Sequence, residues 1–263
     1  MADLNEFDVF YRNAGSALEV IGSLPSSYFH RFPGLEAFIM ATGIRSADEN
    51  WAWIKSNSYS RELLIEVISK FEERQLQFIW PVFPDSSVQM GLDMDELGLV
   101  VREVLNAMIF DSAFVHVNDK SGDLKLKTTK ALTSKDATLW ADTCWRGFAK
   151  EKETLQPEFV RFAQSAVLND KLSLVLGYVE NEPVGTFMLC ENEGFFISHF
   201  SVLPEWRNLG IGSLLMNELM NYTYFIKKRY LVLIATKQGE RLYKKFGFKN
   251  VGSISIRSLN EFT

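Results

Sequence analysis

The stretch that most constrains this 263-residue chain is VLPEWRNLGIGSLL, from Val202 to Leu215. An apolar, strand-like run ends at Pro204, glycines follow at positions 210 and 212, and apolar residues recur at helical spacing from Ile211. A helix that begins after a glycine-containing turn exposes unpaired N–H groups in its first turn. These groups, together with the helix dipole, bind anions such as phosphate. The pattern therefore predicts a site for a phosphate-bearing ligand.

The segments around this stretch alternate between strand and helix patterns. Strands are expected at residues 124–129, 171–179, 184–190, 194–203, 230–236 and 251–256. Helices are expected after Ser134, from Ile211 onward and over residues 238–246. Strands with interleaved helices indicate a mixed α/β (α+β) fold.

The N-terminal half predicts strands at residues 36–42, 49–54 and 76–84, and helices at 61–74 and 93–108. It shows no cluster of catalytic residue types. The polar stretch VNDKSG, residues 117–122, is typical of a linker. We therefore expect an accessory domain over residues 1–120 and a second domain over residues 121–263.

Composition excludes several functional classes. A net charge of -5 and a pI near 5.4 give no electrostatic footprint for nucleic acid. No apolar run is long enough to cross a bilayer, and MADLNEFDVF lacks the features of a signal peptide. Cys144 and Cys190 form neither a metal-binding spacing nor a disulfide framework. We expect a cytoplasmic protein with no metal, no nucleic acid and no membrane partner.

Three kinds of phosphate loop compete for the glycine stretch. A Walker loop ends in Gly-Lys-Ser/Thr, but Gly212 is followed by Ser213 and Leu214. A Rossmann loop needs a third glycine at position 215, which is leucine, and an acidic residue after the next strand, YLVLIAT, which has none. The acyl-CoA loop, Arg/Gln-x-x-Gly-x-Gly/Ala, matches residues 207–212 at every fixed position.

With these residues the sequence resembles the GNAT superfamily of acyl-CoA-dependent N-acetyltransferases. Val202, Pro204 and Glu205 precede the loop as in the family's V-x-P-E-x-R, and RLYKKFGF (241–248) is similar to its second signature, Leu-Tyr-x-x-x-Gly-Phe. The resemblance covers roughly residues 124–257. It implies a twisted mixed sheet with two central strands splayed apart. The N-terminal half looks like a smaller, degenerate GNAT unit that binds no CoA and packs against the acceptor side; the alternative is an unrelated α+β accessory domain.

The resemblance also implies an activity and a set of site residues. The family transfers an acetyl group from acetyl-CoA to an amine, which attacks directly and forms a tetrahedral intermediate. Tyr243 matches the tyrosine that donates a proton to the departing thiolate. The main chain at Val202 aligns the pantetheine. The diphosphate rests on the loop that follows, namely Arg207, Asn208, Leu209, Gly210, Ile211, Gly212 and Ser213.

The sequence departs from the family at several positions. Thr236 and Gly239 stand where many relatives carry Asn and Ala. The positions of the usual general base correspond to Phe196 and Ser198, which do not titrate usefully. His199 is adjacent, but strand alternation points it to the opposite face unless a bulge intervenes. The base is then water, a residue of another element, or not required.

Two questions stay open at this point. The missing base leaves an alternative, an acyl-CoA-binding sensor or regulatory module with a GNAT fold and no turnover. The acceptor is a small molecule, a peptide or a protein N-terminus. A set of aromatic residues suits the wall of an acceptor pocket and an ordinary core equally well: Trp140, Trp145, Phe148, Phe159 and Phe162.

Overall fold

The computed structural model describes residues 5–112, 125–148, 154–226 and 228–259. The expected linker at residues 117–122 lies outside these ranges. We refer to residues 5–112 as the N-terminal half and to residues 125–259 as the C-terminal half. Within the part of the chain that is described, no helix has both the length and the hydrophobicity needed to span a bilayer.

The centre of the molecule is an eight-stranded mixed sheet with the order β4-β11-β5-β10-β9-β8-β7-β6. Its neighbours are antiparallel except β9 and β10, which are parallel. The predicted mixed α/β fold is confirmed. The strands are β4 (Trp80–Val82), β5 (Leu99–Asp111), β6 (Lys127–Lys130), β7 (Leu172–Val179), β8 (Glu182–Glu191), β9 (Phe195–Val202), β10 (Tyr230–Ala235) and β11 (Lys249–Leu259).

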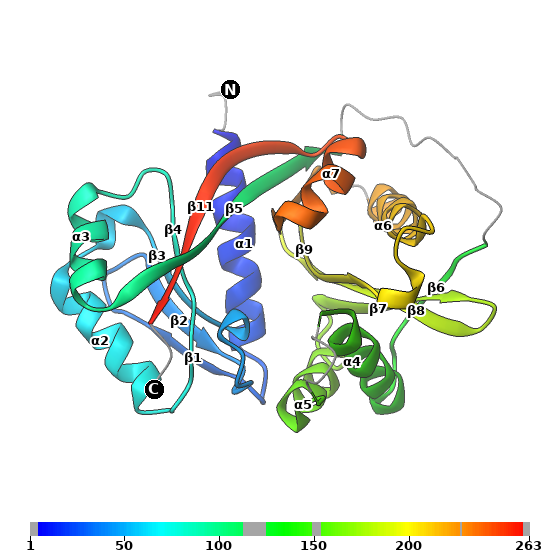
Figure 1. Cartoon of the computed structure of the whole chain (residues 1–263), viewed down its shortest axis with the longest axis horizontal. Coiled ribbons are helices and arrows are strands. Elements are labelled where there is room, and N and C mark those ends of the chain that lie inside the picture. Colours follow the sequence, from blue (N-terminus) through cyan, green and yellow to red (C-terminus); the bar gives the residue numbers. More distant parts are fainter. Residues whose placement is uncertain (1–4, 113–124, 149–153, 227, 260–263) are drawn as a thin grey trace.

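The two halves exchange strands across this sheet. β5 of the N-terminal half lies between β10 and β11, and β11 of the C-terminal half lies between β4 and β5. Figure 1 shows β5 and β11 as two long ribbons that run together across both halves. A second sheet, β1 (Tyr28–Arg31), β2 (Ala37–Ala41) and β3 (Asn50–Ile54), meets β4 through a parallel bridge between Trp51 and Ile79. Both halves therefore contribute strands to the same eight-stranded sheet.

Helices cover both faces of the large sheet. One hydrophobic core joins α1, α4 and α5 to one set of strand residues, such as Met188 and Phe196. A second core joins α6 and α7 to the alternate set, such as Phe187 and Ile197. Figure 1 shows α4 and α5 on one side of the C-terminal half and α6 and α7 on the other. The helices are α1 (Glu6–Gly22), α2 (Arg61–Glu72), α3 (Val88–Glu96), α4 (Ser134–Phe148), α5 (Pro157–Ala166), α6 (Ile211–Ile226) and α7 (Lys237–Lys245).

The helix predicted over residues 93–108 is wrong. α3 ends at Glu96, Gly98 has φ 81° and reverses the chain, and β5 begins at Leu99. A positive φ suits glycine because it has no Cβ. β5 then pairs with β10 along one edge and β11 along the other. Such non-local pairing overrides local helical spacing.

Candidate active site

The two parallel strands at the centre of the sheet stay together over only a short distance. Their register runs from Leu231 opposite Phe195 to Leu233 opposite Ile197. Beyond this point β10 continues beside β5, while β9 continues to Val202 beside β8. The edge of β9 that faces β10 therefore has no described strand partner from residue 198 onward.

A β-bulge lies directly beyond this point. The register of β8 and β9 shifts between the pairs Met188–Ser198 and Thr186–Ser201. His199 has φ 50°, a left-handed conformation in which histidine is enriched among non-glycine residues. A bulge inserts one extra residue and resets the alternation of side chains. Ser198 and His199 consequently share the face covered by α4 and α5, whereas Phe200 stacks on Phe187 on the other face.

Buried hydrogen bonds hold the bulge in place. The Thr186 hydroxyl donates to the carbonyl of His199 at 3.0 Å. The indole N–H of Trp140 on α4 donates to the carbonyl of Phe187, across from the bulge, at 3.3 Å. The imidazole packs among the rings of Trp140, Phe159 and Phe162, with centroids 5.5–5.8 Å away. The orientation of His199 is therefore fixed by the core.

The imidazole of His199 connects the two halves of the molecule. Its Nδ1 lies 3.1 Å from the hydroxyl of Ser198, and its Nε2 lies 3.3 Å from a carboxylate oxygen of Glu49. Glu49 belongs to the 3₁₀ turn Ala47–Glu49 of the N-terminal half. The side chains of His199 and Glu49 are only 13% and 20% exposed. Because 150 residues separate them, no local sequence pattern signals this contact.

The loop between β9 and α6 presents a row of free main-chain donors. Asn208 and Gly210 both have positive φ, 62° and 84°, and α6 begins at Ile211. The N–H of Arg207 donates to Pro204, and that of Ser213 donates to Gly210. For the N–H groups of residues 208–212 no acceptor occurs among the residues that the structure describes. Successive N–H groups in such a turn form a concave site for anions.

The side chain of Arg207 connects this loop to α4. Its Nε donates to the carbonyl of Val202 at 3.1 Å, and its Nη2 donates to the carbonyl of Gly147 at 2.7 Å. The guanidinium thus fixes the end of β9 against the end of α4 and keeps its positive charge beside the loop. Val202, the last residue of β9, has its carbonyl engaged in this way.

Tyr243 of α7 lies on the opposite face of the sheet from His199. Its ring meets that of Phe200, the residue after His199, edge to face at 6.0 Å. Gly239 makes room for it, since a Cβ there would be 2.9 Å from the tyrosine ring. The side chain is buried, and burial raises the pKa of Tyr243 above its usual value of 10.0. The hydroxyl therefore stays protonated at neutral pH.

These features coincide with matches to known proteins. Residues 170–250 match a family model described as the acetyltransferase (GNAT) domain.

The C-terminal half therefore contains a GNAT acetyltransferase domain over residues 170–250.

Solved structures show that the fold extends over the whole chain. A GCN5-related N-acetyltransferase from Kribbella flavida matches with a TM-score of 0.68 at 10% identity, covering 97% of this chain and 96% of that one. A tandem GNAT protein from the clavulanic acid biosynthesis pathway matches with a TM-score of 0.60 at 9% identity, covering 96% of each chain. A GCN5-related N-acetyltransferase from Sphaerobacter thermophilus matches with a TM-score of 0.57 at 16% identity, covering 84% of this chain and 76% of that one. No curated protein sequence matches this chain.

The N-terminal half repeats the strand order of the GNAT domain without its anion loop. β3 leads into α2 as β9 leads into α6, and β3 bonds in parallel to Ile79 just before β4. The hydroxyl of Ser60 accepts from the N–H of Leu63 and so caps α2. At the start of this helix Arg61 pairs with Asp93 at 3.2 Å. The start of α2 therefore carries a capping serine and an ion pair.

Thr236 also serves an internal role in this GNAT domain. Its hydroxyl accepts from the N–H of Gly239 at 3.2 Å and caps α7. The aromatic residues considered for an acceptor wall divide into two groups. Trp140, Phe159 and Phe162 are buried, whereas Trp145 is half-buried and Phe148 is 59% exposed. The first group forms the core around His199.

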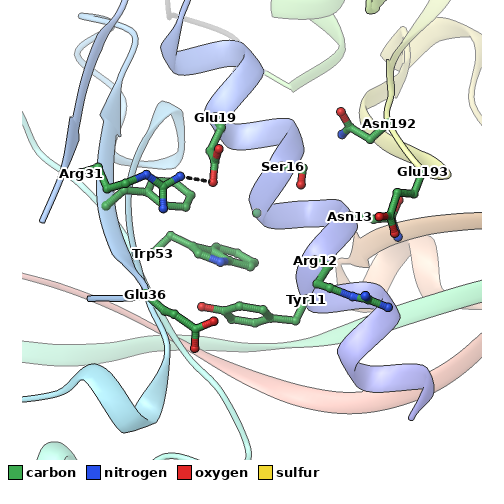
Figure 2. Close-up of a pocket in the computed structure, with 12 residues that line it drawn as sticks. Tyr11, Arg12, Asn13, Ser16, Glu19, Arg31, Glu36, Trp53, Asn192 and Glu193 are labelled. Carbon is green, nitrogen blue, oxygen red and sulfur yellow. Dashed lines mark ion pairs between the residues drawn. The ribbon is translucent and has the colours of Figure 1, made fainter. Parts of the chain in front are cut away.

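A cavity of about 210 Å³ lies elsewhere, between α1, the small sheet and the β8–β9 turn. Figure 2 shows Tyr11 and Trp53 with their rings one above the other and Arg31 paired with Glu19. Glu36 on the same wall pairs with Lys55 at 3.0 Å. None of the lining residues comes from the β9–α6 loop or from α7. This cavity is therefore separate from the candidate site of the GNAT domain.

Proposed function

We propose that the protein is an N-acetyltransferase that transfers an acetyl group from acetyl-CoA to an amine. The observation that carries this proposal is the row of unpaired N–H groups at residues 208–212, directly after the strand that separates from β10. The match of residues 170–250 to the GNAT domain supports acyl transfer in general. The choice of acetyl, the amine acceptor and the residue roles are our inference.

In this proposal each part of the site has one role. The free amides and the dipole of α6 bind the diphosphate of CoA, because a helix N-terminus attracts anions. The edge of β9 up to Val202 aligns the pantetheine through main-chain hydrogen bonds. The thioester then lies beside the bulge at His199. The acceptor, a small-molecule or peptide amine, approaches from the face of α4 and α5.

The reaction proceeds by direct attack. The amine nitrogen forms a bond to the thioester carbon, and the carbonyl electron pair moves to oxygen. When this tetrahedral intermediate collapses, the carbonyl is restored and the carbon–sulfur bond breaks. Tyr243 donates its proton to the departing thiolate and is reprotonated from solvent. Because burial raises its pKa, the phenol carries its proton at neutral pH when the thiolate forms.

The activity is tested by measuring thiol release from acetyl-CoA over a panel of amines, alongside calorimetric titration with CoA. We expect CoA binding and turnover on at least one amine. CoA binding without turnover on any amine would favour the acyl-CoA sensor instead. Failure to bind CoA would contradict both functions. A cytoplasmic setting is part of the same proposal, supported by the two free, buried cysteines.

Replacing Tyr243 by Phe tests the proton donor. The hydroxyl makes no hydrogen bond to any described residue, so the fold should be little affected. We expect kcat to fall by about 10²- to 10⁴-fold, the usual contribution of a general acid, with CoA affinity unchanged. Tyr178→Phe on β7 is the matched control and should retain full activity. A Tyr243→Phe variant with normal kcat would remove this role.

A further inference from the structure

We infer that Ser198, His199 and Glu49 form a proton relay that accepts the proton of the attacking amine. This inference rests on the proposed acetyltransferase function and supplies the general base that the sequence lacks at its usual positions. The three side chains form a continuous chain of contacts, from Ser198 Oγ to His199 Nδ1 at 3.1 Å and from His199 Nε2 to Glu49 Oε1 at 3.3 Å.

The position of the relay follows from the separation of β9 and β10. Ile197 is the last residue of β9 that pairs with β10, and Ser198 is the next residue. The relay thus starts where the parallel strands part. All three residues are partly exposed, and the side chains of His199 and Glu49 are 13% and 20% exposed. The hydroxyl of Ser198 lies next to the point where the strands separate and is therefore the member that meets the acceptor.

The bulge is what brings Ser198 and His199 together. In a regular strand adjacent side chains point to opposite faces. The left-handed conformation of His199 places its ring on the face of Ser198, between α5 and the N-terminal half. Backbone strain of this kind persists only where the surroundings enforce it. Here the buried donors of Thr186 and Trp140 do so.

The contacts fix the direction of proton transfer. An ionised carboxylate only accepts hydrogen bonds, so Nε2 carries the proton that faces Glu49 and Nδ1 is free to accept. As the amine nitrogen bonds to the thioester carbon, its proton passes to Ser198 Oγ while the hydroxyl proton passes to Nδ1. The imidazolium that results is paired with Glu49. It returns the proton to solvent after the thiolate has taken a proton from Tyr243.

Glu49 gives the N-terminal half a part in the chemistry. The 3₁₀ turn that carries it is also tied to the C-terminal half nearby, where the N–H of Arg45 donates to the side-chain oxygen of Gln156 at 2.9 Å. Charged groups of the N-terminal half surround this turn. Asp48 and Glu103 each have a raised pKa, mainly through desolvation, and Arg102 opposes both shifts. The relay therefore ends at a group of carboxyl side chains in the N-terminal half, where Asp48 lies near Glu49 and Glu103 lies near Asp48.

The test is a His199→Asn variant, because asparagine tolerates the left-handed conformation of the bulge but cannot take up a proton at neutral pH. We expect kcat to fall by about 10²- to 10³-fold, with the dissociation constant for CoA within twofold of the wild type. The rate of the variant should rise in proportion to hydroxide concentration up to the pKa of the acceptor amine. A structural role alone would not change the pH profile in this way.

Glu49→Gln is a milder second variant at the end of the relay far from the acceptor. Loss of the carboxylate removes stabilisation of the imidazolium, so we expect a 10-fold or larger loss of kcat and an acid limb shifted to lower pH. His30→Asn on β1 is the matched control and should leave kcat unchanged. Intact-mass measurement after incubation with acetyl-CoA alone should show no acetyl adduct on Ser198.

The outcomes separate the relay from the function on which it rests. If the wild type is active and the His199→Asn variant has the same rate and pH profile, the relay alone is overturned. An acetyl adduct on Ser198 would overturn it in favour of a covalent path. Absence of turnover by the wild type on every amine would overturn the proposed function and the relay with it.

Discussion

At the scale of single residues, two buried thiols make stability depend on pH. Cys144 and Cys190 are fully buried and free. Burial raises the pKa of Cys190 to about 12 and raises that of Cys144 as well. The thiols of the unfolded chain ionise near 8.5. Because the folded pKa is higher, their stabilisation is complete below pH 8.5 and is lost as the pH rises toward the folded value.

We therefore predict that the free energy of unfolding falls above pH 8.5 by about 1.4 kcal/mol per pH unit for each thiol. Urea unfolding at pH 8, 8.5 and 9 measures this, since the unfolded tyrosines, with a pKa near 10, are still mostly protonated there. Cys190→Ala should reduce the slope by half. Equal stability at pH 8 and 9 would contradict the prediction, as would a folded protein whose thiols react readily.

At the scale of elements, two glycines near α3 differ in whether their backbone conformation requires glycine. Gly98 has φ 81°, where an added Cβ would lie 3.9 Å from Leu259, so the backbone conformation is what requires glycine. Gly91 lies within α3, where an added Cβ would lie 3.7 Å from the guanidinium of Arg257. Space is therefore available at both positions.

We predict that Gly98→Ala destabilises the protein by about 1–2 kcal/mol, the cost of a left-handed conformation. Gly91→Ala should stabilise it by about 0.5–1 kcal/mol, since alanine loses less entropy than glycine in a helix. Thermal unfolding of both variants beside the wild type measures the difference. Shifts of the same sign would show that the turn at residue 98 does not determine where α3 ends.

Local signals accounted for the elements that carry the anion loop, because alternation in β9 and helical spacing from Ile211 are properties of neighbouring residues. They failed at β5, whose strand conformation depends on β10 and β11 far away in the sequence. The sequence did not decide whether a bulge occurs at His199, for a related reason. Its register is set by Thr186 and Phe187 of β8, and Glu49 reaches it from the other half.

At the scale of the whole molecule, strand exchange makes the halves dependent on each other. Without the N-terminal half, β10 and β11 each lose β5 as a neighbour, including its buried residues Ala107 and Met108. Exposed strand edges promote association with other chains. The division at residue 120 therefore separates the two halves in sequence only. In the fold, β5 and β11 each pair with strands of the other half.

We predict that residues 121–263 expressed alone aggregate or lack a cooperative unfolding transition. Co-expression of residues 1–120 and 121–263 as two chains should restore that transition, since the pairing of β5 with β10 and β11 needs no covalent link. Urea unfolding followed by tryptophan fluorescence measures both. A fragment of residues 121–263 that is monomeric and unfolds cooperatively would contradict the prediction.

The central claim is that the free main-chain donors of residues 208–212 hold the diphosphate of CoA. Asn208→Asp adds one negative charge within this loop, and aspartate tolerates the positive φ of 62°. Asn181→Asp in the β7–β8 turn is the matched control, since Asn181 is exposed and has φ 70°. The two variants differ only in where the charge is placed.

Calorimetric titration of both variants with CoA tests this claim most directly. Repulsion between an added carboxylate and two phosphate charges about 6 Å away in water reduces the binding free energy by about 1.4 kcal/mol, which is about tenfold in affinity. We expect this loss for Asn208→Asp, reduced at high salt, and wild-type affinity for Asn181→Asp. Equal affinity of the two variants for CoA, or no binding by the wild type, would contradict the account.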